Sequence, residues 1–317
     1  MYGKNKTLGN VYRVYGLNVA SEITMPELPA AEQGEGCGID AFIAYGKVSG
    51  DIEDGVVVDP CLKLSKREFY LHIKGTARFY VADGCVIVVQ PEGRGDEEEI
   101  KVFLLGSCLG MLLYQRNIVA MHGGAVVIDG QGIIITGHTG AGKSTLISAL
   151  REKGHKFLAD DVCALTRDDG SNIMIHPSYP QAKLCRDAME RMGYDTENYQ
   201  RTDPYRDKYI VPLDRFFSGK EVVLRGIYEI RKVFNQKTEI NEVLGAEKLK
   251  LILRNVYRME IIHYLGISGS YFKKCLEIAG SVPVYSISRP EGKITVEEQV
   301  GLIMDTLRVK TKLFKPV

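Results

Sequence analysis

The chain has 317 residues, which is long enough for two domains that each bury a core. Its 41 basic and 40 acidic residues almost balance, so no overall field favours nucleic acid or an anionic membrane, and we expect neither as a partner. The seven cysteines are odd in number and include no C-x-x-C pair. This pattern argues against a disulfide framework or a zinc site and is typical of a reducing compartment.

The N-terminus and the most apolar run indicate where the protein resides. Met1–Lys6 lacks the apolar stretch of a signal peptide. The most apolar run, Val102–Tyr114, is about 13 residues long, which suits a buried helix better than a membrane span. We therefore expect a soluble, cytoplasmic protein.

Residues 1–95 are predicted to form a smaller, β-rich N-terminal domain. Short stretches rich in β-branched and aromatic residues alternate with turn residues, and Asp83-Gly84 is a typical hairpin turn. No group of residues here indicates chemistry. The expected strands are Val11–Leu17, Asp40–Lys47, Glu68–Ile73, Thr76–Ala82 and Cys85–Gln90.

Residues 96–317 are predicted to form a second, α/β domain. Pro91–Gly95 ends the strands, and the acidic run Asp96–Glu99 suits the start of a helix. The expected elements are a helix at Glu98–Gln115, a hairpin of Ala125–Ile128 and Ile133–Thr136 turning at Asp129–Gln131, a helix at Ser144–Lys153, a strand at Lys156–Ala159 that continues through Asp160 and Asp161 to Val162–Thr166, a strand at Leu224–Ile230, helices near Glu242–Asn255 and Arg258–Ala279, a strand at Val284–Ser288 and a helix near Val296–Leu307.

A complete phosphate-binding loop follows the apolar run Gly132–Thr136 and matches G-x-x-x-x-G-K-[ST] at every fixed position. Its small residues let backbone N–H groups converge on an anion, and the N-terminus of the following helix adds partial positive charge. Lys143 is predicted to reach the β- and γ-phosphates and Ser144 to ligate Mg²⁺. The chain is therefore predicted to bind ATP with Mg²⁺. The nucleotide-binding residues are Gly137, His138, Thr139, Gly140, Ala141, Gly142, Lys143, Ser144 and Thr145.

Two adjacent carboxylates, Asp160 and Asp161, end an apolar strand 17 and 18 residues after Lys143. A parallel strand beside the strand that leads into the loop would bring them close to the γ-phosphate. Phosphoryl transfer needs a metal to neutralise charge and a carboxylate to orient or deprotonate the accepting hydroxyl. Neighbouring strand residues point to opposite faces, so the pair can divide these tasks.

His122 precedes the hairpin that delivers the loop, and its imidazole is a candidate to contact the γ-phosphate or assist the carboxylate base. A purely structural histidine is the alternative. The segment Tyr179–Tyr209 interleaves tyrosines with Arg186, Arg191, Arg201 and Arg206. It is either a lid or substrate loop whose arginines contact phosphate, or a surface excursion with packed tyrosines, and both interpretations remain open.

Taken together, Met121-His122-Gly123, the loop with Lys143-Ser144, and Gly154-His155 followed by Ala159-Asp160-Asp161 resemble HPr kinase/phosphorylase. The resemblance is to its C-terminal catalytic domain, a phosphoenolpyruvate-carboxykinase-like P-loop fold. It is close from His122 to about Thr166 and looser over 96–317. Two further segments resemble shorter HPr-kinase-like proteins found with ribosomal peptide pathways, some of which phosphorylate a serine of a precursor peptide. These segments are Gly16-Leu17 with Glu27-Leu28-Pro29, and Pro177–Pro180 with Lys183-Leu184.

The resemblance implies a role for each matching residue. Lys143 binds phosphate, Ser144 and Asp160 hold the metal, Asp161 accepts the hydroxyl proton, and His122 faces the transferred phosphate. His138 stands where the family usually has an acidic residue, and neither the metal-binding E-x-R-G-x-G segment nor the basic loop that engages HPr is found. These departures leave phosphorolysis, HPr as substrate and hexameric assembly open, and they do not affect the expectation of nucleotide binding.

The leading hypothesis is an ATP-dependent kinase that phosphorylates a serine or other hydroxyl of a peptide or protein, with a precursor peptide as one candidate and a homo-oligomer as one expected state. A nucleotide-gated peptide-binding module with little turnover is the first alternative. A small-metabolite kinase is the second. A GTPase is disfavoured because no N-K-x-D-type guanine motif is present.

Overall fold

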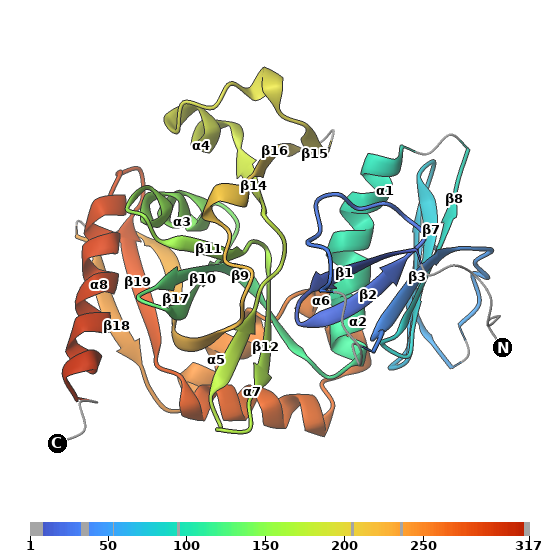
Figure 1. The fold of residues 1–317 in the computed structure, drawn as a ribbon. Coiled ribbons are helices and arrows are strands. Elements are labelled where there is room, and N and C mark those ends of the chain that lie inside the picture. The colour runs from blue at the N-terminus through green and yellow to red at the C-terminus, as the bar shows by residue number, and fades with distance from the viewer. Residues whose placement is uncertain are drawn as a thin grey trace.

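The computed structural model describes residues 9–32, 38–52, 54–93, 96–203, 206–234 and 237–313. Within these ranges the chain is of the α/β class, as predicted. One eight-stranded sheet is built from the N-terminal part, a second eight-stranded sheet from the remainder, and a three-stranded sheet projects beside them (Figure 1).

The first sheet has the order β1-β2-β3-β8-β7-β6-β5-β4. The predicted strand Val11–Leu17 is wrong in one respect: the chain reverses at Tyr15 and Gly16, whose φ angles are 55° and 78°, and makes a hairpin. The strands are β1 (Asn10–Val14), β2 (Leu17–Ser21), β3 (Ala41–Tyr45), β4 (Val56–Asp59), β5 (Leu62–Leu64), β6 (Glu68–Ile73), β7 (Ala77–Ala82) and β8 (Val86–Pro91).

The predicted helix Glu98–Gln115 is confirmed, with a π-helical turn in its middle. It comprises α1 (Glu97–Phe103), η1 (Leu104–Cys108) and α2 (Leu109–Gln115). Asp96 caps its start by accepting a hydrogen bond from the backbone N–H of Glu98 at 3.0 Å. All of η1 is buried, because the helix lies between the two large sheets and contacts both (Figure 1).

The second sheet has the order β10-β9-β12-β13-β17-β19-β18, with β11 also paired to β9. Because β17 pairs with both β10 and β13, five strands form a closed circuit. The strands are β9 (Val119–Ile128), β10 (Gln131–Gly137), β11 (Lys156–Ala159), β12 (Val162–Arg167), β13 (Ile173–His176), β17 (Val222–Val233), β18 (Glu239–Val243) and β19 (Val284–Pro290).

The projecting sheet has the order β14-β16-β15. Its elements are β14 (Gln181–Cys185), α4 (Arg186–Arg191), η2 (Thr196–Asn198), β15 (Arg201–Asp203) and β16 (Arg206–Pro212). The remaining helices are α3 (Lys143–Glu152), η3 (Asp214–Phe216), α5 (Ala246–Arg254), α6 (Met259–Ile262), η4 (His263–Leu265), α7 (Gly269–Ser281) and α8 (Val296–Leu313).

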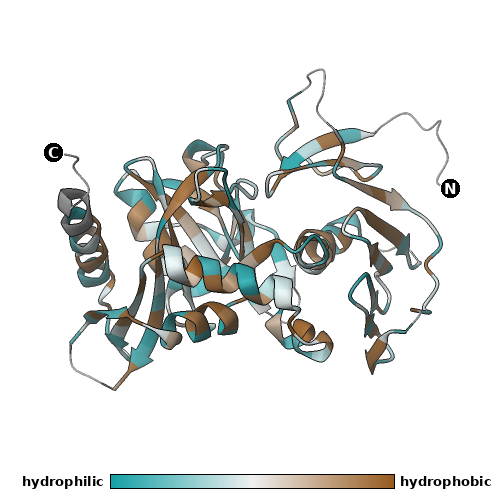
Figure 2. Cartoon of the chain, turned by 90° about the horizontal axis from the view of Figure 1, so that it is seen from below, coloured by the Kyte–Doolittle hydropathy of each residue, from teal (hydrophilic) through white to brown (hydrophobic). Residues whose placement is uncertain are grey.

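Two predicted helices differ from the structure. The one expected near Glu242–Asn255 begins later, because residues 239–243 form the edge strand β18. The one expected over Arg258–Ala279 is interrupted. Gly266 has a φ of 67°, which ends the first helical stretch, and Ser268 caps α7 through a hydrogen bond from Tyr271 N–H at 3.2 Å. Figure 2 shows hydrophobic and hydrophilic residues alternating along α7, which buries one face only.

A single hydrophobic cluster spans both large sheets, joining residues such as Phe79 of β7 to Met121 of β9 and Ile134 of β10. Polar contacts cross the same junction: Arg116 Nη2 lies 3.1 Å from Asp40 Oδ1. The division into domains at residue 95 therefore stays a prediction, since one core serves both parts.

No helix in the described ranges combines the length and apolar character needed to cross a membrane. Six of the seven cysteines are described, and all six are free: Cys61, Cys85, Cys108, Cys163, Cys185 and Cys275.

Candidate active site

The predicted phosphate loop leaves the end of β10, a strand fixed on both sides by β9 and β17. Two of its glycines are required by the backbone. Gly137 has a φ of 135°, and a Cβ there would lie 2.4 Å from the carbonyl oxygen of Ile230. Gly142 has a φ of 108° and occupies the position before α3. The loop is thus held in one conformation by its sequence and its neighbouring strands.

The first turn of α3 is not capped by any side chain and carries no acidic residue. Lys143 Nζ donates a hydrogen bond to Gly137 O at 2.6 Å, so the ammonium folds over the loop. Burial and the positive charge of Lys208 lower the pKa of Lys143, while the charges of Asp161 and Asp160 oppose that shift. From β19, Arg289 Nε donates to Ala141 O at 2.7 Å and adds a further cation.

The other predicted loop residues differ in exposure. His138, Thr139 and Gly140 are exposed and Ala141 is buried. Ser144 and Thr145, in the first turn of α3, are half-buried. Their assignment to nucleotide binding stays a prediction.

Asp160 and Asp161 occupy a tight turn between β11 and β12, and not the continuous strand that was predicted. The N–H of Val162 donates to Asp160 O at 2.7 Å, and Asp161 has a φ of 66°. A left-handed non-glycine residue costs of order 1 kcal/mol, and such strain is concentrated at functional sites. The turn directs the two carboxylates to different partners.

The carboxylate pair lies at the loop's edge of the sheet, but by a different route from the one predicted. β11 does not lie beside β10, because β9 lies between them and pairs with both. Since β10 and β11 are each antiparallel to β9, they run in the same direction and end at the same edge. The expected juxtaposition therefore arises from a shared middle strand.

Asp161 is paired with His122. Asp161 Oδ1 lies 3.2 Å from His122 Nδ1, and the two side chains are 32% and 37% exposed. Burial alone would raise the pKa of Asp161, but the hydrogen bond from His122 and the charge of Lys183 outweigh it and hold the pKa well below its usual range. Asp161 is therefore ionised at neutral pH.

Asp160 has a different environment. Its Oδ2 accepts a hydrogen bond from the backbone N–H of Lys183 at 2.8 Å. Burial and the nearby negative charge of Asp161 raise the pKa of Asp160 despite that bond. Of the two carboxylates, Asp160 is the one whose charge is less well compensated, and it gains more from an added cation.

Three buried tyrosines surround the pair, and sequence reasoning singled out only Tyr179, as the first residue of the segment Tyr179–Tyr209. They are Tyr15 of the β1–β2 turn, Tyr179 before β14 and Tyr257 after α5. Burial raises the pKa of each phenol, and the negative charge of Asp161 adds to the shift. The Tyr257 ring lies 6.2 Å from that of His122. No local pattern marks Tyr15 or Tyr257, because they meet Asp161 only after folding.

A buried network of hydrogen bonds, formed by Thr136, Asn255, Glu229 and Arg254, contacts the backbone of His122. Thr136 Oγ1 lies 2.6 Å from His122 O and 2.8 Å from Asn255 Oδ1. Asn255 Nδ2 donates to Glu229 Oε1 at 3.0 Å, and Arg254 Nε donates to the same oxygen at 2.8 Å. Asn255 O also accepts a hydrogen bond from His122 N–H at 2.7 Å. This network fixes the end of β9 that carries the imidazole.

The segment Tyr179–Tyr209 proves to contain the first strands of the projecting sheet. Arg186 and Arg201 each reach Asp207 at 2.6 Å and also contact the buried Tyr209 hydroxyl. These contacts favour packed tyrosines over free phosphate-binding arginines for those two positions. The side chains of Arg191 and Arg206 lie outside the described part of the structure.

Among the described residues, no group of three or more His, Cys, Asp or Glu side chains is arranged to hold a metal ion. The metal site predicted at Ser144 and Asp160 stays a prediction. Both side chains carry oxygen ligands, and Mg²⁺ usually keeps several waters and takes few protein ligands.

Comparison with known proteins places this site in a family context. A family model for the HPr Serine kinase C-terminal domain matches residues 115–212. HPr kinase/phosphorylase of Chloroherpeton thalassium is 43% identical over 113 residues, which are 33% of this chain and 32% of that protein. HPr kinase/phosphorylase of Treponema pallidum is 38% identical over 56 residues, and that of Listeria monocytogenes is 40% identical over 57 residues. The resemblance inferred from the motifs is thus confirmed over this segment.

The matches are partial. The chain spans about a third of the length of the first relative and 18% of the other two. Among solved structures, the Hpr(Ser) kinase/phosphatase from Coxiella burnetii aligns over 62% of this chain and 99% of that one, with a TM-score of 0.32 and 15% identity. A score this low does not establish a common overall fold.

Proposed function

We propose that the chain is an ATP-dependent kinase that transfers the γ-phosphate to a serine or other hydroxyl of a peptide or protein. One observation carries the proposal: β10 and β11 run in the same direction on either side of β9, so the loop with Lys143 and the pair Asp160–Asp161 lie at the same edge of the sheet, where Asp161 is paired with His122. The phosphate loop, its lysine and the two carboxylates thus occur together at one edge of the sheet. The HPr kinase/phosphorylase names of the relatives support this activity.

The loop fits a triphosphate. The uncapped first turn of α3 leaves backbone N–H groups directed at the loop, as anion binding at a helix N-terminus requires. Lys143 at present donates to the loop carbonyl of Gly137, and this contact is replaced by phosphate oxygens when a nucleotide binds. Arg289 holds the loop from its other side.

The oxygen atoms near the loop also fit Mg²⁺. The Ser144 hydroxyl and the Asp160 carboxylate are the hard ligands that this ion prefers, and Asp160 is the carboxylate whose negative charge is less well compensated. When bound there, Mg²⁺ supplies neutralisation of the charge on the transferring phosphoryl group.

The remaining steps belong to the side chains of this chain. Lys143 holds the terminal phosphates in line with the acceptor. Asp161 is ionised before transfer and accepts a hydrogen bond from the acceptor hydroxyl. It takes the proton of that hydroxyl as transfer proceeds. Because the pKa of Asp161 is lowered in the free protein, the charge of bound phosphates is needed to raise it. His122 orients Asp161 through its Nδ1 contact.

The test is phosphoryl transfer from γ-labelled ATP to serine peptides, read by label on a hydroxyl. Label on a peptide that is lost in Asp161→Asn supports the kinase. Tight ATP binding without label on any peptide would instead indicate the peptide-binding module. Label confined to small metabolites would identify the third possibility.

A further inference from the structure

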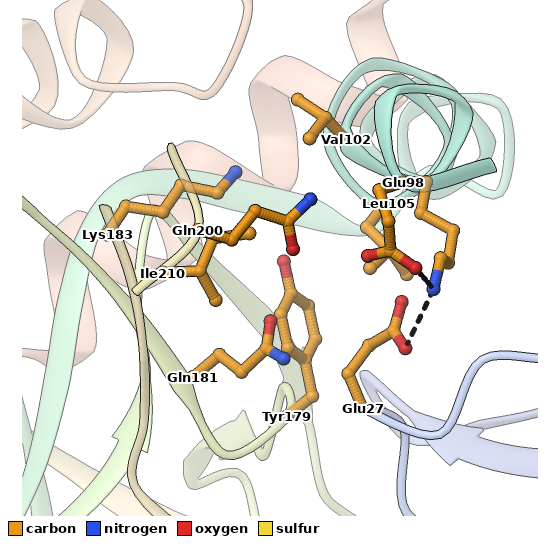
Figure 3. Close-up of a pocket in the computed structure, with 10 residues that line it drawn as sticks. Glu27, Glu98, Val102, Leu105, Tyr179, Gln181, Lys183, Gln200 and Ile210 are labelled. Carbon is orange, nitrogen blue, oxygen red and sulfur yellow. Dashed lines mark ion pairs between the residues drawn. The ribbon is translucent and has the colours of Figure 1, made fainter. Parts of the chain in front are cut away.

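A polar pocket lies where the first sheet, α1 and the projecting sheet meet (Figure 3). The space between its lining residues, together with the open solvent at its mouth, is about 410 Å³. The turn before β3 and helix α1 contribute Glu27, Glu98 and Lys101, and the start of β14 contributes Tyr179, Gln181 and Lys183. Residues far apart in the sequence thus share one cavity.

The pocket adjoins the carboxylate pair. Lys183 lines it with its side chain, while its backbone N–H donates to Asp160 at 2.8 Å. Tyr179 also lines it and is only 7% exposed. Burial raises the pKa of Tyr179, and the negative charges of Asp161, Asp160 and Glu27 add to the shift. Lys183 therefore links the pocket directly to Asp160, at the proposed site of transfer.

The charges on the α1 side of the pocket do not balance. Lys101 is the one ammonium shared by Glu98, with which it makes a close ion pair, and Glu27, which lies 3.8 Å away. Glu27 and Lys101 are 8% and 9% exposed. Burial raises the pKa of Glu27 because Lys101 compensates its charge only in part. Lys183 approaches from the opposite wall in Figure 3, and its charge acts on Asp160 and Asp161.

We propose that this pocket receives a lysine or arginine side chain of the acceptor polypeptide, close in sequence to the hydroxyl that is phosphorylated. The proposal rests on the kinase function above and names the recognition chemistry of its substrate. A basic side chain adds a second cation beside Glu27, which Lys101 compensates only in part. An acidic side chain would add a third carboxylate beside Glu27 and Glu98, and an apolar one would leave the compensation of Glu27 incomplete.

The rest of the lining suits a long basic side chain. The amide of Gln181 and the phenol of Tyr179 offer hydrogen-bond acceptors for the N–H groups that Glu27 does not engage. Val102, Leu105 and Ile210 supply apolar surface for the methylene stem. In Figure 3 the Tyr179 hydroxyl points toward Gln200, which closes one side of this space.

The experiment uses fluorescent peptides that hold one serine and carry Lys, Arg, Gln or Glu at one neighbouring position at a time. Binding is measured by anisotropy without nucleotide, and phosphoryl transfer is measured with γ-labelled ATP. At one position, Lys and Arg should improve both binding and kcat/KM by about tenfold over Gln. Glu27→Gln should reduce that preference to within about twofold by raising KM for the basic peptide.

Two further variants sharpen the result. Glu99→Gln makes the same charge change on α1 outside the pocket and should keep the preference. Gln200→Glu adds a carboxylate at an exposed wall position, where folding is not at risk, and should strengthen the preference. KM for ATP should stay unchanged in all three variants, since none contacts the phosphate loop.

Each outcome decides a separate claim. If peptides are labelled without a preference for a basic residue, the pocket assignment is overturned and the kinase stands. The same conclusion follows if the preference survives Glu27→Gln and does not grow in Gln200→Glu. Glu27-dependent binding of basic peptides without any label supports the pocket and overturns the kinase. Neither binding nor label overturns both.

Discussion

The two sides of the carboxylate pair are built in different ways. On the side where we propose that the nucleotide binds, called the nucleotide side below, one continuous segment from Gly137 to Thr145 supplies the loop, and β9 and β17 hold the strand that precedes it. On the other side, Tyr15, Tyr179 and Glu27 come from separate elements and meet through tertiary packing. Changes to the first side should therefore affect every substrate, whereas changes to the second should affect the choice of acceptor.

The largest expected effect is that of Asp161→Asn, at the junction of the two sides. Loss of the proton acceptor should lower kcat by roughly 10²–10⁴-fold and leave ATP affinity within a few fold. Single-turnover transfer and nucleotide titration measure the two quantities. Asp169→Asn, an exposed aspartate beyond β12, is the matched control and should retain activity. If ATP affinity fell together with the rate of transfer, Asp161 would be assigned to nucleotide binding and not to proton transfer.

Lys143→Met should be nearly as damaging, because it removes the cation of the nucleotide side. We expect a loss of about 10²–10³-fold in kcat/KM, equal for all peptides, together with weaker ATP binding. Lys153→Met, just beyond the other end of α3, is the control, since Lys153 pairs with Glu297 at the surface. A loss that differed between basic and neutral peptides would contradict the separation of the two sides.

The network beneath His122 should give an intermediate effect. Asn255→Ala leaves the buried Glu229 and Thr136 short of a partner, at a cost of about 1–3 kcal/mol in the free energy of unfolding. Because both residues act through one network, Thr136→Val and Asn255→Ala should be non-additive by about 0.5–3 kcal/mol in urea unfolding. Thr166 lies outside this network and makes its hydrogen bond with His176. The effects of Thr166→Val and Asn255→Ala on the free energy of unfolding should therefore be additive.

The smallest expected effect is on stability, and its sign differs between the two aspartates. The raised pKa of Asp160 means that its ionisation destabilises the free fold, so Asp160→Asn should raise the unfolding temperature at neutral pH. The pKa of Asp161 is lower in the folded than in the unfolded chain, so its ionisation stabilises the fold at neutral pH, and this stability is lost as pH falls through the folded pKa. Asp161→Asn should therefore lower the unfolding temperature at neutral pH.

Calorimetry from pH 7 downward measures both shifts, and each kcal/mol corresponds to roughly 2–4 °C. The advantage of Asp160→Asn should shrink first, as the wild-type Asp160 becomes protonated. Shifts of the same sign for both variants at pH 7 would contradict the assigned environments.

The sequence predicted the backbone of the phosphate loop well, because a short motif determines it. The loop, the helix after it and the hairpin before it occur where the pattern placed them, and Gly137 and Gly142 have the φ angles that only glycine adopts easily. The roles of Lys143, Ser144 and Asp161 stay predictions. The pairing of strands was less accessible: periodicity identifies β11 as a strand but does not show that β9 separates it from β10.

On the other side of the carboxylate pair, the sequence marked only the segments that hold Glu27 and Tyr179, and the contacts of the remaining residues were not predictable. Tyr15 and Tyr257 are single tyrosines whose neighbours carry no pattern, and Lys208 affects Lys143 only through the fold. Even the turn at Tyr15 was hidden, because an aromatic residue in left-handed conformation is rare and reads locally as strand. Contacts between distant segments, unlike loops, leave no local pattern.

The shared hydrophobic cluster has a practical consequence for dissecting the protein. A fragment starting at residue 96 would expose the face of α1 and η1 that Phe79 and its neighbours cover, and it would also lose Tyr15 from beside Asp161. Trimming the N-terminal sheet is therefore not a way to isolate a minimal catalytic unit. If the N-terminal sheet were replaced in evolution, the new sheet would have to keep the surface that packs against α1 and η1. The two parts of the chain are therefore expected to evolve together.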